Sequence, residues 1–375
     1  MNRNLKLVSL SLFAWGVGEG LFLFFQPIYL QKMGANAISI GAILGAVGLM
    51  TTISQIPSGY LSDRFGARPI MWLSWVLGTI AAGLMALASS LNLFIVGLLL
   101  YGLTGSVLAP MNSFITSNRG NWSAERSLTF TSAAYHFGAV IGPSIGGFLG
   151  EQIDLRILYY FAAGIFVIST FLIFWIDKPV LEFHVEKQTK NSFLNNSPFM
   201  KIVGLGFVTM FFMVFTQNFS SVFLTDFRQV SLQQIGFLGT IGSLGNVILA
   251  LTLGHLPSKA GFLISLPFTL LFPTLILLGG NFYLYAIAFI GFGGYRLARS
   301  MLLAYSREYI HARETGLAYG IIETVNGMAI ILAPILCGIV YNQHPESIYI
   351  ISIIGLVFIS VINLIFLPPK STKVI

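Results

Sequence analysis

Five ionisable side chains of this sequence lie deep inside long apolar runs: Glu19, His136, Arg296, Arg299 and Glu323. A charged group in the interior of a bilayer costs about 3 kcal/mol on insertion scales, so such residues are usually functional or paired. A carboxyl group in apolar surroundings can load a proton and release it when the surroundings change. An arginine in the same setting pairs with an acid or binds an anion. These residue types therefore indicate proton transfer and anion recognition.

The spacing of these residues suggests which of them pair. Arg296 and Arg299 are one helical turn apart and share a face. Arg299 and Glu323 each lie seven residues from the expected cytoplasmic end of their helices, which is a depth of about 10 Å. We expect them to form an ion pair, which could also be purely structural, and to leave Arg296 free. Glu19 has no basic residue in the membrane interior of its own half except His136, so Glu19 and Glu323 are the expected proton-coupling residues.

Polar and aromatic residues near these positions are candidates for contact with a solute. Trp15, Phe22 and Gln26 lie at helical spacing from Glu19, and aromatic walls suit amphipathic or ring-bearing solutes. His136 is more often a hydrogen-bonded packing residue, but it remains a candidate. The expected substrate-binding residues are Trp15, Phe22, Gln26, Asn112, His136, Gln217, Asn218, Arg296, Arg299 and Asn326.

The helices that must position these residues follow from the composition. Of the 375 residues, 55% are hydrophobic and 9% are charged, whereas soluble domains carry about 25% charged residues. About 20 consecutive apolar residues form a helix that spans a bilayer. We therefore expect an all-α polytopic membrane protein. Its 12 expected transmembrane helices cover residues 5–30, 37–58, 69–90, 92–117, 127–150, 157–176, 200–224, 232–253, 261–279, 281–305, 316–341 and 347–367.

The charge distribution predicts the orientation and the domain organisation. Most of the 20 Lys and Arg residues fall in loops on one side of the membrane, which the positive-inside rule makes the cytoplasmic side. Both termini are then cytoplasmic. The first apolar run is too long for a signal-peptide core and is interpreted as a retained helix. A cytoplasmic linker is expected at residues 177–199, between six-helix bundles at residues 1–176 and 200–375.

The two halves share small-residue positions in equivalent spans. Such matches indicate an internal repeat, which is typical of transporters built from two related halves. Gly41 recurs at an offset of 195 as Gly236, and Pro143 and Gly147 recur at an offset of 191 as Pro334 and Gly338.

Two motifs carry a resemblance to a known family. Residues 59–68, GYLSDRFGAR, resemble the signature loop of the major facilitator superfamily, and residues 138–147, GAVIGPSIGG, resemble its fifth-span antiporter motif. The chain resembles the drug/proton antiporter-like members of this family. The resemblance implies two pseudo-symmetric six-helix bundles in which spans one, four, seven and ten surround a central cavity. Ala67 departs from the pattern, because the family usually has a basic residue there.

The resemblance implies that the loop is a cytoplasmic conformational latch. Asp63 would approach the start of the eleventh span near Thr315 and Gly316, where free N–H groups favour an anion. The two arginines of the loop would pair with Glu125, and its glycines would permit a turn with positive φ. The latch residues are Gly59, Asp63, Arg64, Gly66 and Arg68.

Glycines repeat every four residues in the fifth-span motif and predict a helix-packing seam. They allow another helix to approach closely, and the proline removes a backbone hydrogen bond and bends the span. The expected packing residues are Gly138, Gly142, Pro143, Gly146 and Gly147.

These features favour a secondary transporter that works by alternating access, as a proton-coupled efflux antiporter of a small organic solute. One alternative is proton-coupled uptake of a small organic anion or sugar-like solute, which the two arginines favour. Another is a non-transporting membrane sensor with the same fold.

Other functional classes find little support in the sequence. It contains no HExxH or GxxxxGK[ST] motif, and its single cysteine, Cys337, can form neither an intrachain disulfide nor a thiolate metal cluster. We therefore expect no enzymatic activity, cofactor or metal ion. The net charge of +7 is distributed along one membrane side, which argues against nucleic acid as a partner. The expected setting is a monomer in the lipid bilayer of a bacterial inner membrane.

Overall fold

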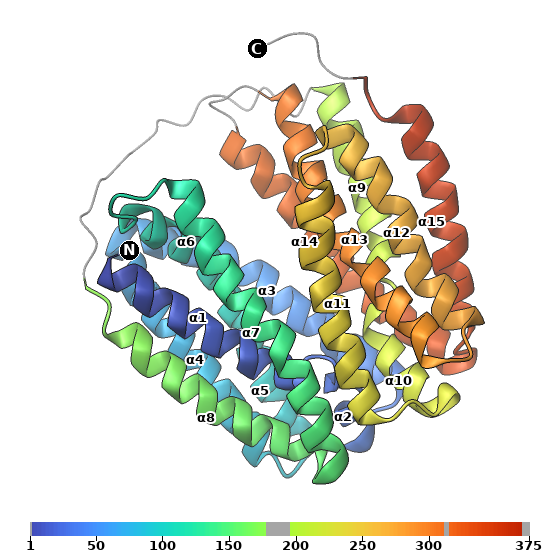
Figure 1. The fold of residues 1–375 in the computed structure, drawn as a ribbon, viewed down its shortest axis with the longest axis horizontal. Coiled ribbons are helices and arrows are strands. Elements are labelled where there is room, and N and C mark those ends of the chain that lie inside the picture. The colour runs from blue at the N-terminus through green and yellow to red at the C-terminus, as the bar shows by residue number, and fades with distance from the viewer. Residues whose placement is uncertain (1, 178–195, 311–314, 370–375) are drawn as a thin grey trace. The chain divides into compact units, whose positions relative to one another are not determined.

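The computed structural model describes residues 2–177, 196–310 and 315–369, except for the side chains of Glu125 and of residues 315–319. All regular structure in these ranges is helical (Figure 1). The first half contains α1 (Arg3–Phe22), α2 (Gln26–Lys32), α3 (Ala37–Phe65), α4 (Ala67–Leu87), α5 (Leu91–Leu103), η1 (Thr104–Val107), α6 (Leu108–Ser117), α7 (Ala124–Gln152) and α8 (Leu155–Phe174). The second half contains α9 (Ser197–Val214), α10 (Gln217–Arg228), α11 (Leu232–Leu253), α12 (Ser258–Leu278), α13 (Phe282–Ser306), η3 (Arg307–Tyr309), α14 (Thr315–Gln343) and α15 (Ser347–Phe366).

These helices account for every expected span and make the chain an all-α polytopic membrane protein. Among the described residues, 10 helical segments are long and apolar enough to cross a bilayer. The two remaining spans correspond to α7 and α13, which are 29 and 25 residues long. Because α13 carries Arg296 and Arg299, its hydropathy is low for a span. The two arginines that are candidates for a functional role thus lower the hydropathy by which this span would be recognised.

Three spans that the sequence predicts as continuous helices are interrupted. The first is divided into α1 and α2, the fourth into α5, η1 and α6, and the seventh into α9 and α10. Prolines account for two of the interruptions, since Pro27 and Pro110 lack the N–H that would continue the helical hydrogen bonds. The Ser106 carbonyl, four residues before Pro110, instead accepts a 2.8 Å hydrogen bond from the Ser58 hydroxyl of α3.

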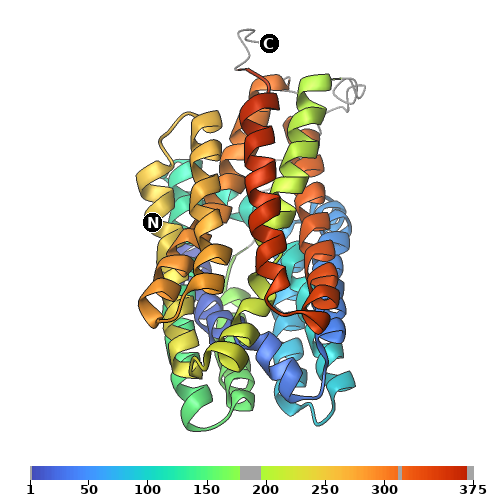
Figure 2. The same ribbon diagram turned by 90° about the vertical axis from the view of Figure 1, so that its right-hand side faces the viewer.

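The helices gather into two units. Unit 1 consists of Met1–Asn36, Ala46–His184 and Gln229–Thr240, and unit 2 of Ala37–Gly45, Val185–Arg228 and Ile241–Ile375. In unit 1, α1 packs along α7 and α8, and α4 packs against α8 and α5 (Figure 1). In unit 2, α12 packs along α13, α14 against α9, and α15 against α12 and α9 (Figure 2). The first turns of α3 thus belong to unit 2 and those of α11 to unit 1.

The repeated glycines and prolines make equivalent contacts in the two units. In unit 2, a Cβ atom on Gly41 would overlap the carbonyl oxygen of Pro334. In unit 1, a Cβ atom on Gly236 would overlap the carbonyl oxygen of Pro143, and Gly147 lies against the same turn of α11. Both helix pairs therefore depend on glycine for close approach. These equivalent contacts agree with the internal repeat that the sequence predicts.

The segment predicted as a latch loop is largely helical, which corrects its expected geometry. Helix α3 continues through Pro57 and Gly59 to Phe65, so Gly59 lies within the helix. The turn is confined to Gly66, whose φ is +87°. The guanidinium group of Arg68 lies 4.2 Å from the ring centroid of Trp72, and that of Arg64 lies over Phe65. The expected partners Glu125, Thr315 and Gly316 have side chains outside the described residues, so the latch stays a prediction.

Candidate functional site

The carboxylate of Glu19 meets a tyrosine hydroxyl inside unit 1. Glu19 is half-buried near the C-terminal end of α1, and the Tyr135 hydroxyl of α7 donates a 2.7 Å hydrogen bond to its Oε2 atom. Tyr101 of α5 also interacts with Glu19 and with the Trp15 side chain. The ring of His136 packs against the ring of Tyr135, with centroids 5.1 Å apart. A carboxyl group with hydroxyl partners in a membrane span is suited to hold and exchange a proton.

Glycines bring α1 and α7 close enough for this contact. A Cβ atom on Gly138 would lie 2.7 Å from the backbone nitrogen of Val17, and one on Gly142 would lie 2.6 Å from the carbonyl oxygen of Val17. From the other side, a Cβ atom on Gly16 would overlap the carbonyl oxygen of Tyr135. Because these neighbours are backbone atoms, a side chain cannot displace them without moving a helix.

The remaining residues of the glycine motif lie along the same helix. A Cβ atom on Gly146 would overlap the carbonyl oxygen of Leu21, which continues the contact with α1. The ring of Pro143 lies against Gly20 of α1. Gly147 instead contacts α11. The motif therefore contacts two neighbouring helices, mainly α1 and, through Gly147, α11.

The aromatic candidates on α1 are buried inside unit 1. Trp15 is 9% exposed and Phe22 is fully buried. The Trp15 ring stacks on Phe166 at 4.1 Å, and Phe22 lies 5.4 Å from the Tyr101 ring. Gln26 is 6% exposed at the start of α2. Their role as substrate contacts stays a prediction, because in this structure they fill the interior of the helix bundle.

A second polar group lies in unit 2. The ion pair predicted between Arg299 and Glu323 is present, and both side chains are half-buried. One turn further along α14, the Asn326 side-chain oxygen accepts a 3.3 Å hydrogen bond from the Tyr295 hydroxyl. Tyr295 is also within electrostatic range of both arginines. Arg296 is exposed but is not free, as it has an interaction of its own in the structure.

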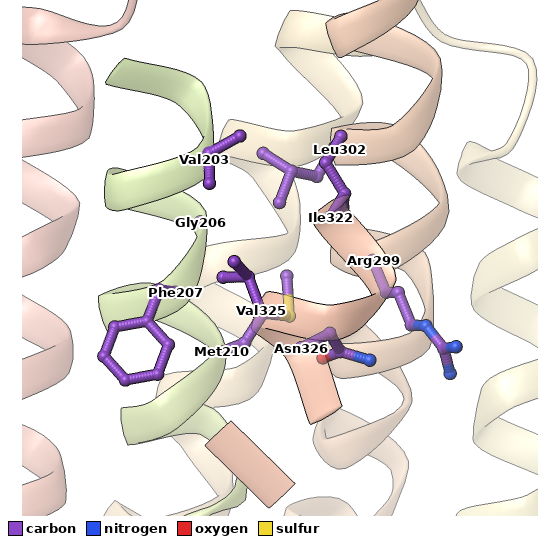
Figure 3. Close-up of a pocket in the computed structure, with 9 residues that line it drawn as sticks. All are labelled: Val203, Gly206, Phe207, Met210, Arg299, Leu302, Ile322, Val325 and Asn326. Carbon is purple, nitrogen blue, oxygen red and sulfur yellow. The ribbon is translucent and has the colours of Figure 1, made fainter. Parts of the chain in front are cut away.

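An apolar pocket opens beside this polar group (Figure 3). It lies between α9, α13 and α14, and its polar end is formed by Arg299 and Asn326. A Cβ atom on Gly206 would lie 2.5 Å from the Leu302 side chain, so this glycine lets Leu302 pack against α9 where both residues line the pocket. The apolar lining residues are Val203, Gly206, Phe207, Met210, Leu302, Ile322 and Val325.

Three amide candidates lie outside both groups. Asn112 is exposed on α6. Gln217 and Asn218 lie at the start of α10, just after the interruption of the seventh span, and are exposed and half-buried respectively. Neither the pocket nor the Glu19 contact includes them. Their assignment to the substrate site stays a prediction.

Tyr101, Tyr135 and the apolar pocket residues were not among the functional positions predicted from the sequence. Tyr135 directly precedes His136, and that position was the available signal. Apolar pocket residues such as Phe207 gave no signal, because side chains that face lipid and side chains that face a pocket are equally apolar. Among the described residues, no group of three or more His, Cys, Asp or Glu side chains could hold a metal ion.

Comparisons with known proteins find matches along nearly the whole chain. The family model described as Major Facilitator Superfamily matches residues 8–229 and 202–374. The chain is 22% identical over 364 residues to the quinolone resistance protein NorA of Staphylococcus aureus, covering 92% of each chain. It is 27% identical over 407 residues to the class B tetracycline resistance protein of Escherichia coli, covering 97% of this chain and 95% of that protein. The crystal structure of the nucleoside transporter NupG matches with a TM-score of 0.83 at 16% identity, covering 97% of this chain and 98% of that one.

Proposed function

This chain belongs to the Major Facilitator Superfamily and is a transporter, and from that premise we propose that it exports a small amphipathic solute in exchange for protons. Glu19 is the proposed proton-coupling residue. In this family of folds, two six-helix halves alternately open a central site to either side of the membrane. We place the protein in the inner membrane of a bacterium, as a monomer with both termini in the cytoplasm.

The observation that carries the proposal is the hydrogen bond from Tyr135 to the Glu19 carboxylate in the interior of the first span. Glu323, by contrast, is paired with Arg299. An arginine partner stabilises the charged form of a carboxylate strongly and so opposes its protonation. A carboxylate with a hydroxyl partner can take up and release a proton more readily. Glu19 therefore supports proton coupling better than Glu323.

The pocket in unit 2 supports an amphipathic substrate. Its lining is apolar except for Arg299 and Asn326 at one end, and its cavity volume of about 10 Å³ suits a small substituent of a solute rather than a whole solute. Two curated relatives are named for resistance to quinolones and tetracycline, which favours export. The alternative is proton-coupled uptake of an organic anion or sugar-like solute, and the observation in its favour is the presence of Arg296 and Arg299 on one helix.

The test is proton movement in liposomes that contain the purified protein and a pH-sensitive dye. Ethidium serves as the amphipathic cation and p-toluenesulfonate as the organic anion. We expect proton flux with ethidium, lost in Glu19→Gln but retained in the control Glu346→Gln, whose side chain is exposed before α15. Unchanged ethidium-driven flux in Glu19→Gln contradicts the assignment of Glu19. Flux with p-toluenesulfonate that is lost in Arg296→Ala supports the uptake alternative, and silence with both probes favours a non-transporting sensor.

A further inference from the structure

We propose that Tyr135 is a positioning residue that holds the Glu19 carboxyl group and sets how tightly it binds its proton. This inference rests on the proposed role of Glu19 in proton coupling. The two residues are 116 positions apart in the chain, and their 2.7 Å hydrogen bond joins α1 to α7.

The glycine contact between the two helices determines where Tyr135 lies. The carbonyl oxygen of Tyr135 is the atom that a Cβ on Gly16 would overlap. Gly16 is one helical turn before Glu19 and shares its face. The backbone of Tyr135 is therefore held against the turn of α1 that carries the carboxyl group, with Gly138 making the reciprocal contact one turn further along α7. Any residue larger than glycine at position 16 would separate hydroxyl and carboxylate.

A second tyrosine hydroxyl lies near the Glu19 carboxylate. Tyr101 of α5 interacts with Glu19, and His136 of α7 packs its ring on Tyr135. The neighbouring helix α8 contributes Phe166, whose ring stacks on Trp15 and Tyr101.

A tyrosine hydroxyl can serve both protonation states of a carboxyl group. It donates a hydrogen bond to the ionised carboxylate and can accept one from the protonated acid. Donation to the ionised form stabilises that form and eases release of the proton. Phenylalanine has the same ring without the hydroxyl, so it removes this stabilisation and leaves the packing. Tyr135→Phe should therefore make Glu19 release its proton at higher pH.

The experiment follows the infrared band of the protonated carboxyl group in the reconstituted protein during a pH titration. The Glu19 band is identified as the one that is absent in Glu19→Gln. A hydrogen bond to a charged group corresponds to a shift of about one to two pH units, so we expect the midpoint to rise by that amount in Tyr135→Phe. The control Tyr160→Phe changes an exposed tyrosine of α8 and should leave the midpoint unchanged. An unchanged midpoint in a folded Tyr135→Phe protein overturns the proposal.

A second variant tests the glycine contact separately. Gly16→Ala keeps the Tyr135 hydroxyl but pushes its backbone away, so it should raise the same midpoint. Gly83→Ala is the matched control, since a Cβ atom there has open space in α4. If Glu19→Gln removes no titrating band and leaves ethidium-driven proton flux intact, the proposed function fails. If Glu19→Gln abolishes coupling while Tyr135→Phe titrates as the wild type, the positioning role of Tyr135 alone fails.

Discussion

The guanidinium group of Arg299 on α13 forms an ion pair with the carboxylate of Glu323 on α14, at the polar end of the unit 2 pocket. Asn326 lies one turn further along α14 and accepts a hydrogen bond from Tyr295. The polar end of the pocket is thus a network shared by two helices. A solute that enters the pocket meets an arginine whose charge is balanced by Glu323, so the ion pair presents no net charge to an amphipathic cation.

This ion pair should respond differently to single and double neutralisation. Arg299→Gln or Glu323→Gln leaves one unbalanced charge within a membrane span, and we expect each to destabilise the protein by about 1–3 kcal/mol, less than a fully buried pair because both side chains are half-buried. The double variant removes both charges and should be more stable than either single variant. Thermal unfolding in detergent measures this. Additive losses in the double variant contradict the pairing.

Filling the pocket should weaken solute binding and spare the proton site. A Cβ atom on Gly206 falls near the Leu302 side chain, so Gly206→Val should fill the apolar space and raise the KM for ethidium about tenfold, equivalent to about 1.4 kcal/mol. Gly204→Ala on the same helix has open space around it and is the matched control. The infrared midpoint of Glu19 should not move in either variant. Normal ethidium transport by Gly206→Val removes the pocket from the substrate path.

The α1–α7 contact should tolerate no side chain at Gly138. In Gly138→Ala the new Cβ atom meets backbone atoms of Phe13 and Val17, and overpacking of this kind costs about 1–3 kcal/mol. Gly164→Ala on α8, where nothing lies within 4 Å, should stabilise the protein by about 0.5–1 kcal/mol through helix propensity. The two unfolding temperatures should thus move in opposite directions. A neutral Gly138→Ala means that α7 can shift freely along α1.

A buried hydrogen-bond network joins α1, α4 and α8. The indole N–H of Trp75 lies 2.8 Å from the Ser11 hydroxyl and 2.9 Å from the Ser169 hydroxyl. We expect either serine alone to change to alanine at little cost, since the other oxygen still accepts. The double alanine variant leaves a buried N–H without a partner and should cost about 1–3 kcal/mol more. Adding Trp75→Phe to the double variant removes the donor and should recover part of that loss, which unfolding in detergent will show.

An ion pair outside the spans should make stability depend on pH. Hydrogen bonds from the Lys32 ammonium group and from the Arg156 backbone N–H lower the pKa of Asp154 below its usual value. The folded state therefore gains stability from the ionised carboxylate above the unfolded pKa of about 3.9, and this gain is lost as the pH falls through the lower folded pKa. Asp154→Asn keeps a residue that can cap α8.

The difference in unfolding temperature between wild type and Asp154→Asn should accordingly be largest near neutral pH and vanish under strongly acidic conditions. The effect is small because both side chains are exposed. High salt should reduce it as well, since salt screens exposed pairs. A difference that persists unchanged in acid means that the carboxylate charge contributes nothing to it.

The sequence alone predicted the membrane class, the spans and the Arg299–Glu323 pair. The membrane class follows from the composition, because a chain with 9% charged residues has too few polar side chains to form the water-facing surface of a soluble protein. The spans follow from the hydropathy, because a helix that crosses the bilayer requires about 20 apolar residues. The Arg299–Glu323 ion pair was predicted because the two residues lie at the same depth on two helices. Opposite charges inside a membrane span attract each other strongly. Glycines and prolines that recur at constant offsets predicted the repeat, because glycine allows close helix approach and proline interrupts the helical hydrogen bonds.

Only the tertiary structure decided the partners of Glu19 and the position of the pocket. Tyr135 is 116 residues from Glu19, and its place beside His136 does not show which carboxylate its hydroxyl contacts. The apolar face of α9 that lines the pocket looks like a face toward lipid, since both environments select the same side chains. Likewise, Gly59 looked like a turn residue, but α3 continues through it to Phe65 and the turn lies at Gly66. Sequence thus reports how deep each residue lies in the membrane, whereas which residues meet at that depth depends on how the helices pack.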